Sequence, residues 1–455
     1  MSQPYADRRG VIGWILFDPA TQPFFTLITT FVFAPYFAAA VAPTPAAGQA
    51  LWGYATAAAG LTIALTAPML GAIADETGRR KPFIALFGGL MALASAGLWL
   101  VEPGRADLVP LALVLFALGT IGAEYAIIFN NAMMTRIVPP ERLGRLSGTG
   151  WAAGFAGGLL SLVFVLGFLA ADPETGRTLV GLEPLFGLDP AAREGDRAAG
   201  PLTALWFAVL VLPLLLFTPD GRGGTGVPIL AAVRGAFASL KETLSRLKHR
   251  PGMGRFLIAN MIYTDGLVAL FAFGGVYAAG TFGWGTIEIG LFGILLTITG
   301  TVGAFVGGRL DDRFGSKRVV LGALALLTAC SIAILTVDAT HIFLVVETVG
   351  PAPGDGLYAT WPERVYMVFG ALIGLAVGPV QAASRTLLCR LAPEGETGRF
   401  FGLFALTGKI TSFAGPLLVG IATDLTDSQR MGVVPLVVFF LVGAFLLSGV
   451  RVPAR

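Results

Sequence analysis

Long apolar runs, separated by short polar connections, dominate the pattern of this chain. A helix needs about 20 predominantly apolar residues to cross the hydrocarbon core of a membrane. The pattern therefore predicts twelve membrane-spanning helices, over residues 11–40, 50–74, 82–102, 107–134, 145–171, 201–218, 255–281, 287–310, 317–337, 363–391, 399–424 and 431–452.

The composition supports this interpretation. Of the 455 residues, 55% are hydrophobic and only 13% are charged, whereas soluble domains carry about 25% charged residues. Mean hydropathy is +0.77. So few charges cannot cover a globular surface, which excludes a soluble enzyme and a disordered chain. The net charge of +3 is too small to indicate nucleic-acid binding.

Lysine and arginine concentrate in alternate connections, for example at 79–81, 136–145 and 309–318. The positive-inside rule places these connections, and both termini, in the cytoplasm. We therefore expect an integral multi-pass protein of a bacterial inner membrane.

The longest basic connection, 219–254, divides the chain into two sets of six spans. We predict an N-terminal bundle over 1–218, a linker with a basic amphipathic helix (233–248) over 219–254, and a C-terminal bundle over 255–455. The basic face of the linker suits either a lipid or partner site, or a simple linker lying on anionic headgroups. The outer stretch 338–362 is expected to hold a short hairpin or an interfacial segment.

An internal repeat supports the division into two halves. Residues 71–81 match residues 308–318 without a gap, at a constant offset of 237. The matched pairs are Gly71 and Gly308, Asp75 and Asp312, Gly78 and Gly315, and Arg80 (preceded by Arg79) and Lys317. A second match, at an offset of 254, pairs Gly144 with Gly398 and Arg145 with Arg399. Parallel repeats of this kind predict two pseudo-symmetric six-helix bundles.

The repeated loop has a physical logic. Its glycine permits a tight turn between antiparallel helices. Its aspartate, near a helix end, can accept hydrogen bonds from the N-terminus of a neighbouring helix. Such a loop would act as a latch that stabilises one conformation. A basic loop with a turn glycine is the alternative, and two copies in equivalent places favour the latch.

Five charged residues lie well inside predicted spans, away from the span ends, where charges are costly and usually face the bundle interior. They are Asp18, Glu124, Asp265, Arg385 and Lys409. Asn131 corresponds to Arg385 at the offset of 254, and Gln381 lies one turn before Arg385. We predict that these seven residues line a substrate or proton pathway. The alternative is a set of buried ion pairs that only fix helix packing.

The sequence offers no catalytic constellation. It contains no nucleophile elbow and no phosphate-binding loop, and its two histidines and two cysteines form no metal-ligand spacing. We expect no metal, no cofactor and no enzymatic activity.

The repeated loop resembles the signature loop of the major facilitator superfamily. Within it, the chain resembles the vacuolar-effluxer-like family, which includes the autophagy-related fungal permeases. The resemblance rests on four interrupted segments: 14–18 with 26–37, 131–134 with 138–151, 263–266 with 273–278, and 381–385 with 400–402, 408–409 and 415–416. It implies the facilitator fold, in which spans one, four, seven and ten line the cavity, and it implies amino-acid efflux in the fungal relatives. Two segments depart from the family pattern: residues 19–22, where the family has Trp-Ala-Asn-Ser, and Thr135-Arg136, where it has Pro-Asp.

We therefore expect an all-α membrane protein that transports a small-molecule substrate by alternating access. Carboxylates and an arginine suit a zwitterion such as an amino acid, with protons as a coupling ion. An effluxer of amphiphiles, such as lysophospholipids or drugs, is the second hypothesis, and a non-transporting sensor or membrane enzyme is the third. Membrane lipids are the other expected partners, and a monomer is the expected state.

Overall fold

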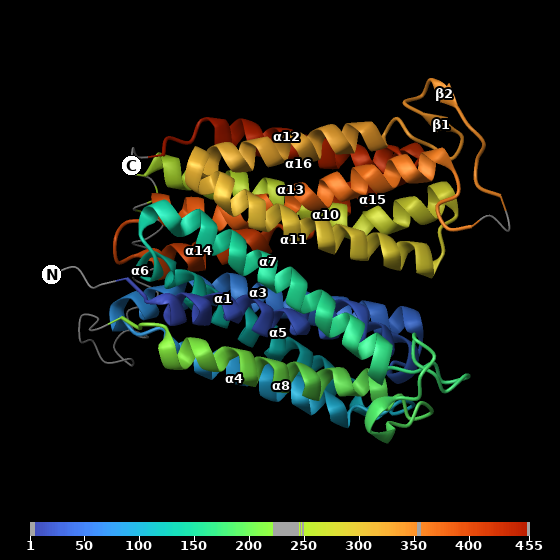
Figure 1. Cartoon of the computed structure of the whole chain (residues 1–455), viewed down its shortest axis with the longest axis horizontal. Coiled ribbons are helices and arrows are strands. Elements are labelled where there is room, and N and C mark those ends of the chain that lie inside the picture. Colours follow the sequence, from blue (N-terminus) through green and yellow to red (C-terminus); the bar gives the residue numbers. More distant parts are fainter. Residues whose placement is uncertain (1–4, 222–244, 246, 248–249, 353–355, 453–455) are drawn as a thin grey trace. The chain divides into compact units, whose positions relative to one another are not determined.

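The computed structural model of the protein describes residues 5–221, 245, 247, 250–352 and 356–452. In this part of the chain, 12 helices are long and apolar enough to cross a membrane, and they are shown in Figure 1. The prediction of twelve spans in an all-α membrane protein is confirmed. The predicted basic helix at 233–248 lies outside the described residues, apart from residues 245 and 247.

The chain forms two compact units that do not follow the chain order throughout. Unit 1 contains Met1–Pro139, Ala153–Leu240 and Glu394–Leu406. Unit 2 contains Pro140–Ala152, Lys241–Pro393 and Thr407–Arg455. Each unit therefore includes one short segment from the opposite half of the sequence. Both short segments carry a glycine-arginine pair of the internal repeat.

The first half of the chain supplies six membrane-length helical segments. They consist of α1 (Arg8–Pro23), η1 (Phe24–Phe31), α2 (Phe33–Tyr36) and η2 (Phe37–Val41); α3 (Pro45–Thr77); α4 (Lys81–Gly97) and η3 (Leu98–Leu100); η4 (Ala106–Leu108), α5 (Val109–Ala132) and α6 (Met134–Ile137); η5 (Pro140–Arg142), α7 (Leu143–Phe164) and η6 (Val165–Leu169); and α8 (Glu194–Phe217), which follows the short turn η7 (Leu185–Gly187).

The second half supplies the other six segments and a hairpin. They consist of α10 (Pro251–Phe282); α11 (Thr286–Phe314); α12 (Ser316–Ile334); α13 (Trp361–Leu391); α14 (Thr397–Ile410) and α15 (Ala414–Thr426); and η8 (Met431–Val433) with α16 (Val434–Ser448). Strands β1 (His341–Ile342) and β2 (Val346–Glu347) pair antiparallel between α12 and α13. Of the two alternatives expected within 338–362, the structure shows the short hairpin.

The first span changes its helical geometry halfway. Proline at positions 19 and 23 removes backbone donors from α1, and the helix continues as the π-helical segment η1. Two threonine hydroxyls in η1 donate to carbonyl oxygens five residues earlier: Thr29 to Phe24 at 3.3 Å and Thr30 to Phe25 at 2.9 Å. Wide turns of this kind are rare and occur frequently at functional sites.

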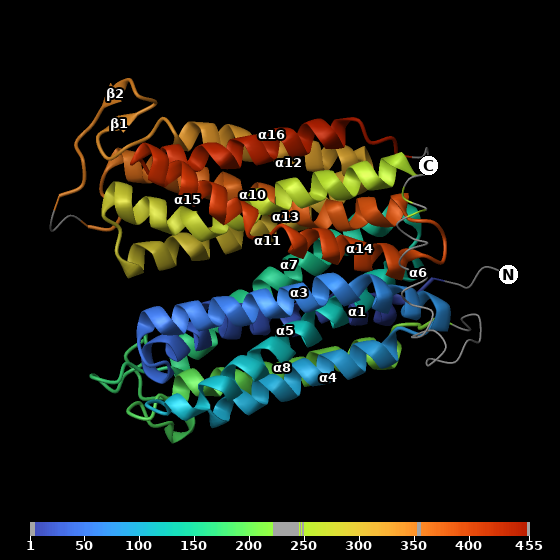
Figure 2. The same cartoon turned by 180° about the vertical axis from the view of Figure 1, so that it is seen from behind.

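The predicted span 399–424 is broken rather than continuous. Residues Thr411 to Phe413 form a turn between α14 and α15, and Figure 2 labels the two segments separately. Non-helical backbone at membrane depth is tolerated where protein or a water-filled cavity surrounds it. A span-length hydropathy average still passes this segment as one span, although its mean hydropathy of 1.4 is the lowest of the twelve.

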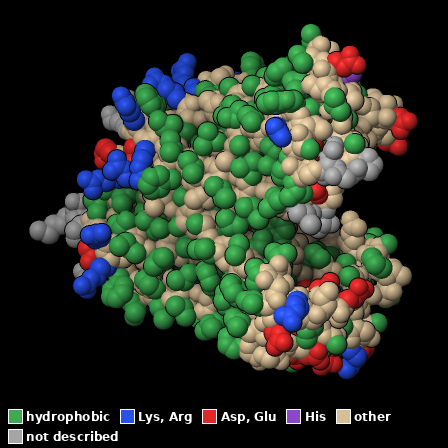
Figure 3. Space-filling view, turned by 45° about the vertical axis from the view of Figure 1, so that its right-hand side comes forward, with side chains coloured by type: hydrophobic (Ala, Val, Ile, Leu, Met, Phe, Trp, Pro, Cys, Tyr) green, Lys and Arg blue, Asp and Glu red, His purple; other side chains and the backbone are tan. Residues whose placement is uncertain are grey.

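The surface reflects a lipid environment. Figure 3 shows hydrophobic side chains over the flanks of the helices and Lys and Arg side chains gathered near one end. Large apolar side chains such as Leu93 and Phe445 are at least 70% exposed. A water-soluble monomer rarely exposes apolar patches of this extent.

Candidate functional site

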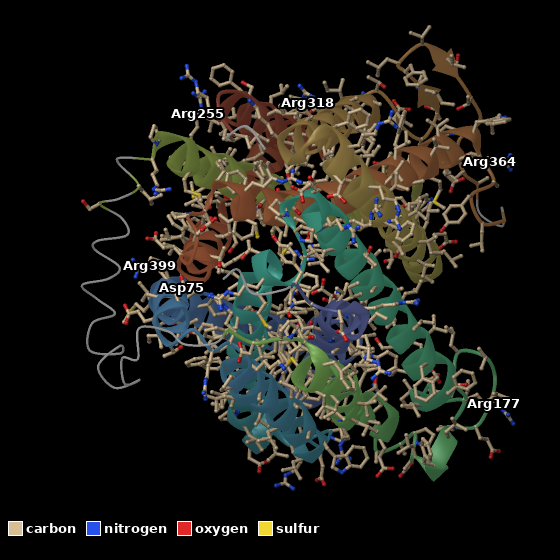
Figure 4. All side chains as sticks on the ribbon, turned by 60° about the vertical axis from the view of Figure 1, so that its left-hand side comes forward. Asp75, Arg177, Arg255, Arg318, Arg364 and Arg399 are labelled. Carbon is tan, nitrogen blue, oxygen red and sulfur yellow. The ribbon has the colours of Figure 1, made fainter. Side chains whose placement is uncertain are left out.

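Asp75 lies in the last turns of α3 and binds the start of α14, within unit 1. Its Oδ1 accepts a hydrogen bond from the Gly398 N–H at 3.0 Å, and its Oδ2 accepts one from the Arg399 N–H at 2.8 Å. Figure 4 labels Asp75 and Arg399 at this contact. A carboxylate there satisfies otherwise unpaired N–H groups and interacts favourably with the helix dipole. We call Asp75, Gly398 and Arg399 the Asp75 clamp.

Glycine makes this contact sterically feasible. A Cβ at Gly71 would overlap the carbonyl oxygen of Gly398, and a Cβ at Gly398 would lie 2.7 Å from Asp75 Oδ1. Gly78 ends α3 with a φ of 68°, a conformation that favours glycine. The glycines of the repeated loop therefore serve the turn and the close helix approach.

Unit 2 contains the equivalent arrangement at the second copy of the repeat. Asp312 Oδ1 accepts from the Gly144 N–H at 2.8 Å, and Asp312 Oδ2 accepts from the Arg145 N–H at 3.1 Å. The Arg145 Nε atom lies 3.8 Å from the same carboxylate. We call Asp312, Gly144 and Arg145 the Asp312 clamp. The hydrogen bonds expected from the sequence are present in both copies.

The Asp312 clamp also depends on a close approach of backbones. A Cβ at Gly148 would lie 2.6 Å from the Gly308 Cα, and a Cβ at Gly308 would lie 2.9 Å from the Gly148 Cα. Gly315 follows α11 with a φ of 88°, so it matches Gly78 in role as well as in sequence.

The buried ion pairs beside the two clamps differ. In unit 1, Arg80 Nη2 lies 2.9 Å from Asp75 Oδ1, and the Arg80 side chain is 1% exposed. In unit 2, Arg390 Nη1 lies 2.6 Å from Asp311 Oδ1, with the two side chains 9% and 0% exposed. Ser316 Oγ donates to Asp311 at 2.9 Å. The sequence analysis missed Asp311 and Arg390, although the Asp311–Asp312 doublet was a visible signal.

Lys317 and Arg79 lie away from the clamp carboxylates. Lys317 Nζ donates to the Ser448 and Val450 carbonyl oxygens at 2.7 and 2.8 Å, beyond the end of α16. Arg79 is exposed. Lys317 therefore donates hydrogen bonds to carbonyl groups at a helix C-terminus, where a cation is favourable. Arg80, its counterpart in the repeat, binds a carboxylate instead.

Asp220 is a further residue that the sequence analysis missed. Its two carboxylate oxygens accept from the Arg80 N–H at 2.8 Å and the Lys81 N–H at 3.2 Å. The N-cap residue of α4 makes no side-chain capping bond of its own, so Asp220 supplies the cap from the end of α8. Three aspartates thus cap helices that are distant in sequence.

The pathway residues predicted in unit 1 lie on α1 and α5. Asp18, Gln22 and Thr26 share one face of the first span, because they are four residues apart. That face meets glycines of α7: a Cβ at Gly154 would lie 3.4 Å from the Asp18 Cβ, and one at Gly158 would lie 2.6 Å from Thr26 Oγ1. Asp18 and Gln22 are half-buried.

On α5, Glu124 is half-buried and Asn131 is 8% exposed. Trp14 Nε1 donates to the Asn130 carbonyl oxygen at 2.9 Å, which fixes α1 against α5. The Asn130 side chain is fully buried, and neither of its polar atoms has a hydrogen-bond partner among the described residues. An amide buried in this way costs free energy unless water or a ligand binds it. Asn130 therefore joins its neighbour Asn131 as a candidate site residue.

In unit 2, Asp265 on α10 is 3% exposed and lies next to the broken span. Thr411, in the turn between α14 and α15, lies beside the Asp265 carboxyl group. A Cβ at Gly415 would overlap the Asp265 carbonyl oxygen, so α15 and α10 approach closely. Lys409 lies in the last turn of α14, and its carbonyl oxygen accepts from Ser412 Oγ at 3.0 Å. Asp265, Lys409 and the helix break thus belong to one unit.

Arg385 binds α7. Its Nε donates to Ser147 Oγ at 2.9 Å and its Nη2 donates to the Ser147 carbonyl oxygen at 2.8 Å. Ser147 Oγ donates in turn to the Ala382 carbonyl oxygen at 2.7 Å. The guanidinium also lies 5.8 Å from the Trp151 ring centre. Arg385 is 4% exposed, whereas Gln381, one turn earlier on α13, is half-buried.

The structure thus divides the seven predicted pathway residues between the units. Unit 1 contains Asp18, Glu124 and Asn131, and unit 2 contains Asp265, Gln381, Arg385 and Lys409. Among the described residues, no group of three or more His, Cys, Asp and Glu side chains is arranged to hold a metal ion.

Two solved structures share the fold of this chain. A structure of the major facilitator superfamily transporter FucP, in the outward conformation, aligns over 98% of this chain and 99% of its own, with a TM-score of 0.70 and 14% identity. The human organic anion transporter MFSD10 aligns over 98% of this chain and 100% of its own, with a TM-score of 0.68 and 17% identity. This chain therefore has the same fold as these two transporters.

Within that class, residues 139–454 match the family described as "Vacuole effluxer Atg22 like". The chain belongs to this family. An uncharacterised facilitator-type transporter of Bacillus subtilis, YxiO, is 23% identical over 96% of this chain and 93% of its own length. Autophagy-related protein 22 of Cryptococcus neoformans is 28% identical over 68% of this chain. The chain spans about half the length of that fungal relative.

Proposed function

We propose that this multi-pass membrane protein is a secondary transporter that exports an amino acid or a similar zwitterion by alternating access. The observation that carries the proposal is the duplicated clamp. In both copies of the repeat, an aspartate carboxylate holds the N-terminus of a helix from the opposite half of the sequence. Contacts of this kind, made in one conformation and released in another, let a transporter switch between two stable states.

The zwitterion is supported by the side chains that lie within the membrane-length helices. Asp18, Glu124 and Asp265 are acidic and Lys409 is basic, and all four lie within membrane-length helical segments. Groups of both signs suit a substrate whose ammonium and carboxylate groups can each be paired. We assign the substrate carboxylate to the basic side chains of these helices, Lys409 and Arg385. The family description supports efflux as the direction.

Proton coupling through Asp265 is part of the proposal. Its side chain is 3% exposed, and its Oδ1 has no hydrogen-bond partner among the described residues. A carboxyl group in such surroundings gains from binding a proton when the substrate leaves. We place the protein in a bacterial inner membrane with both termini in the cytoplasm, on the basis of the charge distribution of its connections.

The test is transport in proteoliposomes. Uptake of labelled leucine and tyrosine is measured with and without an imposed pH gradient, for the wild type, for Asp265→Asn, and for Asp189→Asn as a matched control on an exposed loop. We expect gradient-driven uptake that is lost in Asp265→Asn and retained in Asp189→Asn. Gradient-independent uptake would contradict proton coupling. Absence of uptake in folded protein would contradict the amino-acid substrate and favour the amphiphile hypothesis.

A further inference from the structure

Unit 2 contains a cavity that none of the predicted pathway residues lines. Its volume is about 370 Å³, which falls within the range of small-molecule sites. It lies among α10, α12, α13, α15, η8 and α16. Its apolar wall consists of Leu270, Phe273, Val276, Ile334, Val419, Val433 and Leu436.

The buried part of the cavity contains a hydroxyl group that has no hydrogen-bond partner among the described residues. Ser331 on α12 is fully buried, and its Oγ makes no hydrogen bond among the described residues. Serine and threonine in a helix commonly donate to the carbonyl oxygen one turn earlier, as Thr328 does to Leu324 at 2.7 Å. Ser331 does not do so, although it lines the cavity. Its hydroxyl is therefore available to a polar atom inside the cavity.

The open end of the cavity is acidic. Asp424 and Asp427 line it and are exposed, together with Gln429. Among the described residues, the lining contains no lysine or arginine. Two aromatic rings, of Tyr277 and Tyr366, stack in the wall with centres 5.9 Å apart. Aromatic faces and carboxylates both attract a cation.

The nearest arginine in the sequence, Arg430, is already neutralised. Its Nη2 donates to Asp338 Oδ2 at 2.8 Å. Partial burial opposes ionisation of Asp338, but the Thr340 and His341 N–H groups, the His341 ring and Arg430 together hold the pKa of Asp338 well below its usual range. Asp338 is therefore ionised at neutral pH and balances Arg430, so the charge at the cavity opening is that of Asp424 and Asp427.

We infer that this cavity is a second ligand site, separate from the transport pathway, for a small organic cation with one protonated amine on an apolar body. The amine lies between Asp424 and Asp427, and the apolar body fills the space between α10 and α15. A polar substituent on the body reaches Ser331. The inference does not depend on the identity of the transported substrate.

The cavity can be filled without disturbing the fold. Gly420 on α15 lines it, and a Cβ added there meets no atom within 4 Å. Gly420→Leu therefore occupies space in or beside the cavity. Gly322→Leu is the matched control, since Gly322 on α12 also has no atom within 4 Å of an added Cβ and does not line the cavity. Both changes place leucine in a membrane-length helix.

The experiment measures binding to the purified full-length protein in lipid nanodiscs by equilibrium dialysis. The probe is naphthylmethylammonium, and its neutral counterpart is naphthalenemethanol. We expect the ammonium to bind about tenfold more tightly than the alcohol, equivalent to one ion pair of about 1.4 kcal/mol. We expect Gly420→Leu to abolish binding, the Asp424→Asn/Asp427→Asn double variant to weaken it about tenfold, and Gly322→Leu to leave it unchanged.

Three results would overturn the inference. Equal affinity for the ammonium and the alcohol would mean that the acidic opening does not select charge. Unchanged binding in Gly420→Leu would place the probe elsewhere on the protein. Absence of measurable binding of the ammonium by the folded wild type would remove the organic cation as the ligand class. Amino-acid transport is measured in a separate assay, and its outcome does not change how these binding results are interpreted.

Discussion

Asp75 Oδ1 accepts a hydrogen bond from the Gly398 N–H at 3.0 Å, across 323 positions of the sequence. The Asp312 carboxylate makes the same kind of contact with Gly144, across 168 positions. Each contact joins an aspartate at the end of one helix to the first turn of another. Both contacts belong to the internal repeat, so the chain makes the same contact twice. At each site, a short segment from one half of the sequence packs within the unit that consists mainly of the other half.

The Asp312 clamp should be needed for transport more than for folding. Asp312→Ala removes a carboxylate from a helix N-terminus, a change that typically costs about 1 kcal/mol. We expect this variant to fold, to unfold a few degrees earlier, and to lose at least about tenfold in initial transport rate through destabilisation of one state by about 1.4 kcal/mol. Asp75→Ala should destabilise the protein more, because it also leaves the buried Arg80 without its ion-pair partner. Thermal unfolding in detergent and proteoliposome uptake test this.

Asp189→Ala, on an exposed loop, is the control for the clamp variants. If Asp312→Ala transports at the wild-type rate while unfolding earlier, the clamp is a structural cap without a role in switching. That result would remove the main support for alternating access at this contact.

The glycines at the clamps should tolerate no side chain. A Cβ at Gly148 would lie 2.6 Å from the Gly308 Cα, and backbone cannot move aside as a flexible side chain can. We expect Gly148→Ala to destabilise the protein by about 1–3 kcal/mol. Gly89→Ala on α4 is the control, since nothing lies within 4 Å of its added Cβ, and it should be neutral or stabilising by up to about 1 kcal/mol. Equal unfolding temperatures of the two variants would contradict the close approach.

The sequence was sufficient for the parts of the fold that follow from local chemistry. Hydrophobic length predicts the membrane helices, and the two copies of the glycine-aspartate loop predict which carboxylates cap a helix. The turn at Thr411 was not predictable in the same way. It lies beside the close approach of Gly415 to the Asp265 backbone, a tertiary contact that a span-length hydropathy average does not report.

The candidate site shows the same limit. A charge inside an apolar span indicates a special position, but the sequence does not say which partner that charge has. Arg385 binds Ser147, and Asp311 rather than Asp312 forms the buried ion pair with Arg390. These partners come from helices more than 70 residues apart, so only the folded chain identifies them.

The Asp311–Arg390 pair should be sensitive to loss of one partner. Removing one member of a buried pair leaves an uncompensated charge, at a cost of about 3–5 kcal/mol. We expect Asp311→Leu and Arg390→Leu each to lower the yield of folded protein severely, and the double variant Asp311→Leu/Arg390→Leu to recover a large part of it. Size-exclusion chromatography and thermal unfolding of the three variants measure this.

The exposed pair Arg105–Asp107 is the control for the buried pair, and its disruption should change neither the yield nor the unfolding temperature measurably. A double variant worse than both singles would contradict the assignment.

Arg385 and Ser147 should contribute to transport through the same contact with each other. If Arg385 serves mainly to hold α7, then Ser147→Ala and Arg385→Gln should both slow transport without a large change in KM, and the double variant should be little worse than Arg385→Gln alone. Substrate binding by Arg385 would instead raise KM in Arg385→Gln and leave Ser147→Ala close to the wild type. Uptake kinetics of the three variants distinguish the two roles. Ser384→Ala is the control for loss of a neighbouring buried hydroxyl, because the Ser384 hydroxyl forms a hydrogen bond with Tyr263 and not with α7.

The last prediction concerns pH and the loop that carries the hairpin. The backbone and Arg430 contacts hold the pKa of Asp338 below its usual range, against the opposing effect of partial burial. A folded-state pKa below the unfolded value of about 3.9 means that Asp338 contributes stability above that value and loses it as pH falls through its folded-state pKa. We expect the unfolding temperature of Asp338→Asn to lie below that of the wild type by a constant amount between about pH 5 and 8, and the difference to shrink at more acidic pH. Because the Asp338 side chain is 34% exposed, solvent screening keeps the difference small.

Glu347→Gln, on the exposed strand β2, is the control and should match the wild type throughout. A difference that grows as the pH falls below 5 would contradict the sign of the shift.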